Sequence, residues 1–192
     1  MKVTILLGSV REGRQSHRAA QYVEKRLQDK KAKADLIDLA VVPLPILGHE
    51  PSYDAHADAR IKQIGKRLEE SDALILVTPE YQASFSGALK NAIDHYYPEF
   101  QKKVIGVVAA SGGGMAGINA SSQLQHVILG VGGYPMPSKL LIPRVHDAFD
   151  EHAKPKNENI VKMTDGFLEE FLWFAEALVE KRKKDKEEGR AA

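Results

Sequence analysis

A segment with the donors and charges of an anion site follows the short apolar run at residues 3–7. It reads Gly8-Ser9-Val10-Arg11-Glu12-Gly13-Arg14-Gln15-Ser16-His17-Arg18. If a helix begins here after a buried strand, its first backbone N–H groups lack partners and have partial positive charge. The serine hydroxyl groups add hydrogen-bond donors, and the arginines add full positive charges. The segment therefore predicts a site for a compact anion such as a phosphate monoester.

This first loop does not match the common nucleotide-binding patterns. Gly8 and Gly13 have the separation found in a Walker A loop, but Arg14 and Gln15 follow where Lys and Ser or Thr are needed. The dinucleotide pattern G-x-G-x-x-G is also absent. A phosphate monoester is therefore favoured over a nucleoside triphosphate, and a solvated arginine-rich turn stays as the alternative.

Two later loops have residues suited to a planar ligand. In residues 79–86, Tyr81 and Phe85 could flank a flat ring, or they could pack the loop onto the next helix. In residues 111–117, successive glycines would let the backbone approach a flat ring and direct N–H groups at its oxygens. A flexible turn is the alternative there. A second glycine cluster at residues 130–137 is interpreted as the connection to the last strand.

Alternating strands and helices must position these loops. The strands are predicted at Lys2–Gly8, Ala34–Leu39, Ala73–Thr78, Lys103–Ala110 and Lys139–Ile142. The helices are predicted at Ser16–Lys31, Ala55–Ser71, Ser86–Tyr96, Met115–Val131 and Asn159–Lys184. This alternation is typical of an α/β doubly wound parallel sheet, and a phosphate loop after the first strand favours the order 2-1-3-4-5. The three loops then meet at the carboxyl ends of strands one, three and four.

The remaining stretches complete a chain that we expect to form one domain over residues 1–192. Residues 41–53 contain several prolines and are predicted to form a long loop. The last helix has a wide apolar face, in which we place Trp173, and is expected to cover the sheet. Residues from about 181 to 192 are interpreted as a solvated end of mixed charge.

Composition excludes several classes of function. A net charge of +1 argues against a broad nucleic-acid surface, and the absence of cysteine excludes disulfides, thiolate metal sites and iron–sulfur clusters. No segment has the ~18 successive apolar residues of a membrane span, so a cytoplasmic protein without membrane contact is expected. His17, His95 and His126 lack the spacing of metal ligands, so no metal site is predicted.

With these motifs in place, the chain resembles the NADPH-dependent FMN reductase family, whose fold is flavodoxin-like. The family pattern begins with G-S-x-R, continues as P-E-Y-N-x-S-x-P-G-x-L-K-N-A-I-D and ends in G-G-x-x-G. The matching residues are Gly8-Ser9-Val10-Arg11 with Ser16, then Pro79-Glu80-Tyr81 with Ser84 and Gly87-Ala88-Leu89-Lys90-Asn91-Ala92-Ile93-Asp94, then Gly113-Gly114-Met115-Ala116-Gly117. Two positions depart from the pattern, with Gln82 in place of Asn and Ser86 in place of Pro. Ser86 either loosens the loop or caps the next helix.

The resemblance implies a binding site for FMN. The phosphate would be held by the first loop, at Ser9, Arg11 and Ser16, with His17 beside them. The isoalloxazine ring would be bordered by Pro79, Glu80, Tyr81 and Gln82. Its pyrimidine edge would meet Ser111, Gly112 and Gly113. No protein side chain is assigned a catalytic role, because the cofactor provides the redox chemistry.

The resemblance also implies an activity. We expect hydride to pass from NADPH, or from NADH, to FMN and electrons then to pass to quinones, azo dyes, free flavins or metal ions by a ping-pong mechanism. The alternatives are a flavodoxin-like electron carrier, a flavin-binding regulator, or a phosphate-binding enzyme without flavin. Family members are commonly homodimers or homotetramers, so a homo-oligomer is expected.

Overall fold

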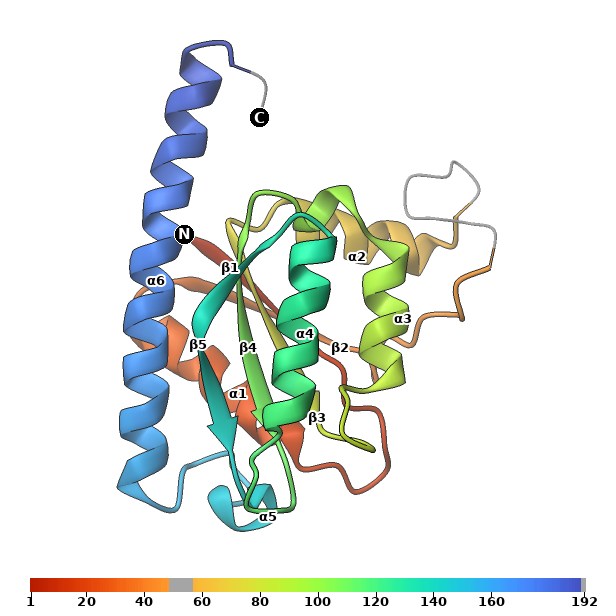
Figure 1. Ribbon diagram of the computed structural model, residues 1–192, viewed down its shortest axis with the longest axis vertical. Helices are drawn as coiled ribbons and strands as arrows, with labels where there is room; N and C mark the ends of the chain where they lie inside the picture. The colour runs from red at the N-terminus through yellow and green to blue at the C-terminus, as the bar shows by residue number, and fades with distance from the viewer. Residues whose placement is uncertain (49–56, 191–192) are drawn as a thin grey trace.

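Five parallel strands form one sheet in the order β2-β1-β3-β4-β5 (Figure 1). The strands are β1 (Lys2–Leu7), β2 (Lys33–Asp38), β3 (Ala73–Pro79), β4 (Val104–Ala110) and β5 (Tyr134–Ile142). The computed structural model describes residues 1–48 and 57–190. The predicted α/β fold and its strand order are therefore confirmed.

Helices cover both faces of this sheet. They are α1 (Ser16–Asp29), α2 (Ala59–Glu69), α3 (Gly87–His95), the 3₁₀ turn η1 (Pro98–Phe100), α4 (Ile118–Gly130), α5 (Val145–Ala148) and α6 (Glu158–Glu187). The apolar sides of α1 and α6 form one core with the sheet, and those of α2, α3 and α4 form the other. Every residue of β3 and β4 is buried, because helices lie on both sides of these central strands.

Two elements begin later or earlier than predicted. β5 starts at Tyr134 rather than Lys139, although Pro135 and Pro137 cannot donate backbone hydrogen bonds. The strand accommodates them because it lies at the sheet edge and its register against β4 shifts between Ile105 and Val107. The second half of the predicted glycine-rich connection, from Tyr134 to Pro137, is therefore strand.

The start of α4 was also predicted too early, at Met115. Gly117 precedes the helix with a φ of 82°, a left-handed conformation that ends the loop and suits glycine. The predicted start of α2 at Ala55 lies outside the described residues. Residues 41–48 form an irregular loop as predicted, and the rest of that loop prediction, to Tyr53, also lies largely outside the described residues.

The long helix α6 corrects one prediction about the C-terminal stretch. Its buried residues recur at helical spacing from Ile160 to Ala175, and Trp173 points away from them with 72% of its surface exposed. Trp173 therefore does not belong to the face that covers the sheet. The charged end is helical to Glu187, and most of its described residues are exposed. Arg182 differs from them, because it donates hydrogen bonds to the carbonyl oxygens of Asp72 (2.7 Å) and Lys102 (3.2 Å).

Candidate functional site

A cavity of about 290 Å³ lies at the carboxyl edge of the sheet, where the three predicted loops meet. The loop after β5, at the bottom of Figure 1 near α5, completes its wall. Of the predicted cofactor residues, the cavity is lined by Ser9, Arg11, Ser16, Pro79, Glu80, Tyr81, Ser111 and Gly112. His17, Gln82 and Gly113 lie outside this wall. The topology thus brings most of the predicted site together.

The first loop offers hydrogen-bond donors that the described part of the chain leaves unused. Ser9 is 1% exposed, and its Oγ has no hydrogen-bond partner among the described residues. Ser16 begins α1, Gln15 before it makes no side-chain cap, and the first turn contains no acidic residue. A buried hydroxyl group beside an uncapped helix N-terminus is suited to bind an anion.

The arginines of this loop differ in their partners. Arg14 forms a two-pronged ion pair with Asp38, in which Nη1 and Nη2 each lie 2.5 Å from a carboxylate oxygen. Nη1 of Arg14 also donates to the carbonyl oxygen of Ser9. Arg11 instead lies over the ring of Tyr81, with 5.2 Å between the guanidinium carbon and the ring centroid. Arg11 thereby joins the first loop to the second across the cavity.

His17 lies in the first turn of α1 and does not line the cavity. Its Nδ1 atom is buried without a partner among the residues that the structure describes. Burial lowers the pKa of His17, and the nearby charges of Arg14 and Arg18 lower it further. The neutral ring therefore predominates near neutral pH, so His17 adds no full positive charge to the first loop.

The second loop is a tight hairpin. Tyr81 and Ser84 exchange two backbone hydrogen bonds of 2.8 and 3.0 Å, with Gln82 and Ala83 between them at φ values of 45° and 59°. Both central residues are thus in the left-handed region, where asparagine and glycine are favoured over other residues. This conformation accounts for the asparagine in the family pattern where this chain has Gln82.

Glu80 lines the cavity and also accepts hydrogen bonds from the start of α4. Its Oε2 atom accepts hydrogen bonds from the backbone N–H groups of Asn119 (3.0 Å) and Ala120 (3.1 Å), at the start of α4. Gly117, the residue before α4, has no side chain to cap this helix. The carboxylate therefore stabilises the α4 N-terminus and fixes the second loop against it.

Ser86, the other departure from the family pattern, links α3 to the first loop. Its Oγ accepts a hydrogen bond from the N–H group of Leu89 (3.2 Å), so the predicted helix cap is confirmed. The same hydroxyl group donates to the carbonyl oxygen of Gly8 at 2.6 Å. A Cβ atom on Gly8 would lie 2.5 Å from the Cβ of Leu89, so only glycine fits at this junction.

The sequence reasoning missed Val145 and His146, which line the cavity from the loop after β5. Backbone hydrogen bonds fasten this loop to the third loop, from Val145 N to Ser111 O (2.9 Å) and from Arg144 N to Gly113 O (3.2 Å). The available signal was that β5 is parallel to β4 and ends at the same edge of the sheet. His146 Nε2 lies 3.1 Å from a carboxylate oxygen of Asp147.

Two further findings concern the described part of the chain as a whole. No group of three His, Cys, Asp or Glu side chains lies close enough together there to hold a metal ion. None of the helices described has the length and apolar character that a membrane crossing requires.

The pattern of the NADPH-dependent FMN reductase family matches residues 1–147 of the chain. The chain belongs to this family. It is 30% identical over 173 residues to an NADPH azoreductase of Bacillus sp. (strain OY1-2), covering 88% of this chain and 93% of that protein. It is 34% identical over 145 residues to an NAD(P)H-dependent FMN reductase of Saccharomyces cerevisiae, covering 68% and 75% of the two chains.

A solved structure supports the same assignment. This FMN reductase superposes with a TM-score of 0.72 on the flavoenzyme NAD(P)H:(acceptor) oxidoreductase FerB of Paracoccus denitrificans, at 25% identity over 95% of this chain and 97% of that one. Membership of the family makes the chain an oxidoreductase that uses FMN with NAD(P)H as the reductant. The unpartnered Ser9 hydroxyl group and the uncapped α1 fit the phosphate of this cofactor.

Proposed function

We propose that this FMN reductase oxidises NAD(P)H and reduces quinones, azo compounds, flavins or metal ions in a ping-pong cycle. When bound, FMN would supply the redox chemistry that links oxidation of the nicotinamide to reduction of the acceptor. The one cavity that unites the three loops supports this order, because donor and acceptor would have to use it in turn. The observation that carries the proposal is the buried Ser9 hydroxyl group without a partner among the described residues.

The chain's own residues then divide into two groups. Ser9, Ser16 and the first N–H groups of α1 hold the phosphate, Arg11 supplies charge, and His17 packs behind them. The flat ring lies against the second and third loops, at Pro79, Glu80, Tyr81, Gln82, Ser111, Gly112 and Gly113. The glycine backbone of the third loop lets N–H groups approach the pyrimidine edge and stabilise negative charge there. The support is that most of these residues line one cavity.

Steady-state kinetics test the proposed cycle. NADPH oxidation is measured at several fixed concentrations of a benzoquinone and of an azo dye. Parallel lines in the double-reciprocal plots are expected, because the oxidised nucleotide leaves before the acceptor binds. Intersecting lines would contradict the ping-pong order, and the absence of turnover without a partner reductase would favour an electron carrier instead.

Cofactor titration tests the assignment of Arg11. In Arg11→Ala, the affinity for FMN is expected to fall about 10- to 100-fold through loss of a charge-assisted contact. Riboflavin, which lacks the phosphate, should bind the variant and the wild type equally well. An unchanged FMN affinity would remove Arg11 from the proposed site.

Two wider expectations belong to the same proposal. A homodimer or homotetramer is supported by Met115 and Ile118, whose side chains near the third loop are 69% and 40% exposed. Light scattering after gel filtration tests this, and a monomer at micromolar concentration would contradict it. A cytoplasmic location is tested by fractionation of the source cells.

A further inference from the structure

We infer that Asp38 and Arg14 form a positioning pair that sets the phosphate specificity of the site without either side chain touching the phosphate. The inference rests on the proposed function, since it concerns how the first loop discriminates FMN from a flavin without phosphate. Arg14 lies in that loop and lines the cavity, so the sequence suggests it as a direct ligand. Its contacts in the folded chain assign it another role.

Three of the five N–H donors of the Arg14 guanidinium group already have partners in the folded chain. Both terminal nitrogens lie 2.5 Å from the carboxylate oxygens of Asp38, and the two side chains are each only 18% exposed. Nη1 makes a further hydrogen bond to the carbonyl oxygen of Ser9. The flat guanidinium group makes these contacts in one plane, so its orientation is fixed by Asp38 and by the carbonyl group of Ser9.

Asp38 is itself fixed by the sheet. It is the last residue of β2 and pairs in register with Leu7, the last residue of β1 before the first loop. Its Oδ1 atom also accepts the backbone N–H group of Ala40 at 3.0 Å. The carboxylate therefore stands on a rigid strand end beside the loop that it must hold.

The ion pair fixes the backbone of Ser9. The hydrogen bond from Arg14 fixes the carbonyl group of Ser9, and a backbone hydrogen bond from Arg14 N to Arg11 O (3.2 Å) closes the turn that follows. With its backbone held, the buried Ser9 hydroxyl group keeps its direction. The pair also cancels its own charge, so the phosphate must be recognised by Arg11, the serine hydroxyl groups and the start of α1.

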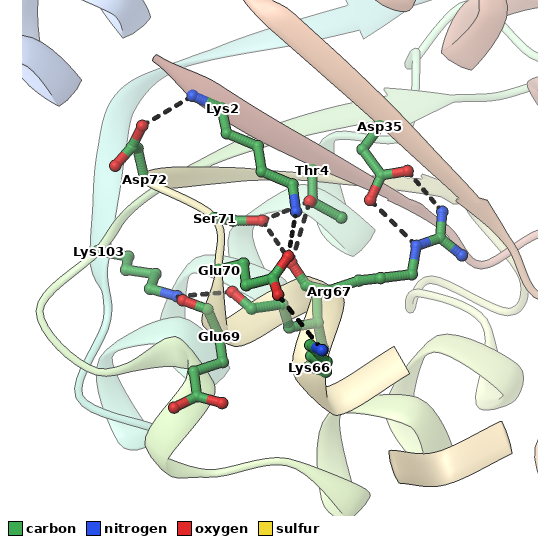
Figure 2. A network of polar contacts seen from close by, with 11 residues as sticks. Lys2, Thr4, Asp35, Lys66, Arg67, Glu69, Glu70, Ser71, Asp72 and Lys103 are labelled. Atoms are coloured by element: carbon green, nitrogen blue, oxygen red, sulfur yellow. Dashed lines mark hydrogen bonds and ion pairs between the residues drawn. The ribbon is translucent and has the colours of Figure 1, made fainter. Parts of the chain in front are cut away.

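A second ion pair on the same strand provides a matched control. Asp35 of β2 accepts two hydrogen bonds from Arg67, at 3.0 Å from Nε and 2.7 Å from Nη2, and Arg67 also donates to the carbonyl oxygen of Leu36 (Figure 2). These side chains are 28% and 29% exposed. The control pair thus has the same chemistry and similar burial, but it contacts no residue of the cavity wall.

The experiment compares FMN with riboflavin. Apo-protein is titrated with each ligand, and the ratio of the two affinities is measured for the wild type, Asp38→Asn, Arg14→Lys, the double variant and Asp35→Asn. We expect the FMN-to-riboflavin ratio to fall about tenfold in Asp38→Asn and in Arg14→Lys, and no further in the double variant, because both changes break one contact. Asp35→Asn should keep the wild-type ratio within about twofold.

The sign of the change decides the inference. If Arg14 were held back from direct phosphate binding by Asp38, Asp38→Asn would free it and raise the ratio, which would overturn the positioning role. An unchanged ratio in Asp38→Asn or Arg14→Lys would also overturn it, as would an equal fall in Asp35→Asn. A wild type that binds FMN and riboflavin equally would overturn the phosphate site itself, and is thereby distinguished from failure of the pair alone.

Discussion

The buried polar side chains of the network around Thr4, at the amino end of the sheet, have partners, whereas the hydroxyl group of Ser9 at the carboxyl end has none among the described residues. At the amino end, the hydroxyl groups of Thr4 and Ser71 bind each other, and Lys103 donates to the carbonyl oxygens of Leu68 (2.6 Å) and Glu69 (2.9 Å) (Figure 2). At the carboxyl end, Ser9 Oγ is buried alone within the described chain.

This difference indicates that the polar network at the amino end stabilises the fold, whereas the Ser9 hydroxyl group at the carboxyl end is available to bind a ligand. A buried polar group without a partner costs about 1–3 kcal/mol, so a chain that only needed to fold would fill or replace it. At the amino end the network of Figure 2 joins β1, β2 and α2 and leaves its buried hydroxyl groups satisfied. Among the buried atoms without a partner in the described chain, the Oγ of Ser9 belongs to a residue that lines the cavity, where a ligand can complete it, whereas Nδ1 of His95 at the end of α3 does not.

The largest effect is expected from a substitution of Gly8, at the carboxyl end of the sheet. Gly8→Ala places a Cβ atom 2.5 Å from the Cβ of Leu89 and 2.9 Å from the Oγ of Ser86. The overpacking should lower the free energy of unfolding by about 3 kcal/mol and displace the first loop. Urea unfolding and flavin retention measure the two effects. Gly166→Ala, in α6 with open space around the added atom, is the control for FMN retention.

The next largest effect concerns Lys103 at the amino end. Burial lowers its pKa from 10.5 to about 8, with the charge of Arg182 contributing. Between these values the unfolded chain binds more protons than the folded chain, so stability from this group rises with pH. From pH 8 to pH 10, the wild type should gain about 2 kcal/mol relative to Lys103→Met.

Urea unfolding at each pH measures this difference. Lys66→Met, a change at a side chain with 76% exposure, should leave the pH dependence of the wild type unaltered. An identical pH dependence in the wild type and in Lys103→Met would show that the folded-state amine titrates normally.

Removal of one buried hydroxyl group at each end of the sheet tests directly whether the two ends differ in their contribution to stability and binding. Ser71→Ala should lower the free energy of unfolding by about 1–2 kcal/mol, because Thr4 loses its closest partner, and should not change FMN affinity. Ser9→Ala should leave the apo-protein as stable as the wild type or about 1 kcal/mol more stable, while FMN affinity falls about tenfold.

Thermal unfolding of the apo-proteins and FMN titration distinguish the two variants. Loss of apo-protein stability in Ser9→Ala, with FMN affinity retained, would assign that hydroxyl group to folding and remove the distinction between the ends.

The smallest effect is expected from relief of backbone strain in the hairpin of the second loop. Ala83 has a φ of 59°, which glycine adopts without the steric cost that other residues have. Ala83→Gly should raise the free energy of unfolding by about 0.5 kcal/mol, the net of relieved strain and a more flexible unfolded chain. Chemical denaturation measures it, and a loss of stability would show that the left-handed conformation is not strained here.

Much of the fold was predictable because its signals are local. β3 is an unbroken apolar run, which is typical of a parallel strand covered on both faces, and the three loops could be located from the strands before them. Their meeting at one cavity follows from the strand order. The capping role of Ser86 was one of two alternatives that its position before a helix suggested, and the structure shows the cap.

The misses depend on relations between distant parts of the chain. The pairing of Arg14 with Asp38 requires the register of β1 against β2, which no local pattern contains. The exposure of Trp173 depends on which side of α6 faces the sheet. Apolar residues occupy a wide sector of this helix, so the sequence alone does not determine that side. His146 lies in the loop after β5, and it lines the cavity because this loop is hydrogen-bonded to the third loop, a contact between segments about 30 residues apart.

The course of α6 has a practical consequence. The helix begins near the carboxyl edge of the sheet and runs past the amino edge, so Met1 and the last described turn of α6 both lie far from the cavity (Figure 1). An affinity tag, a solid support or an electrode linker joined at either end would leave the mouth of the cavity open to bulky dyes.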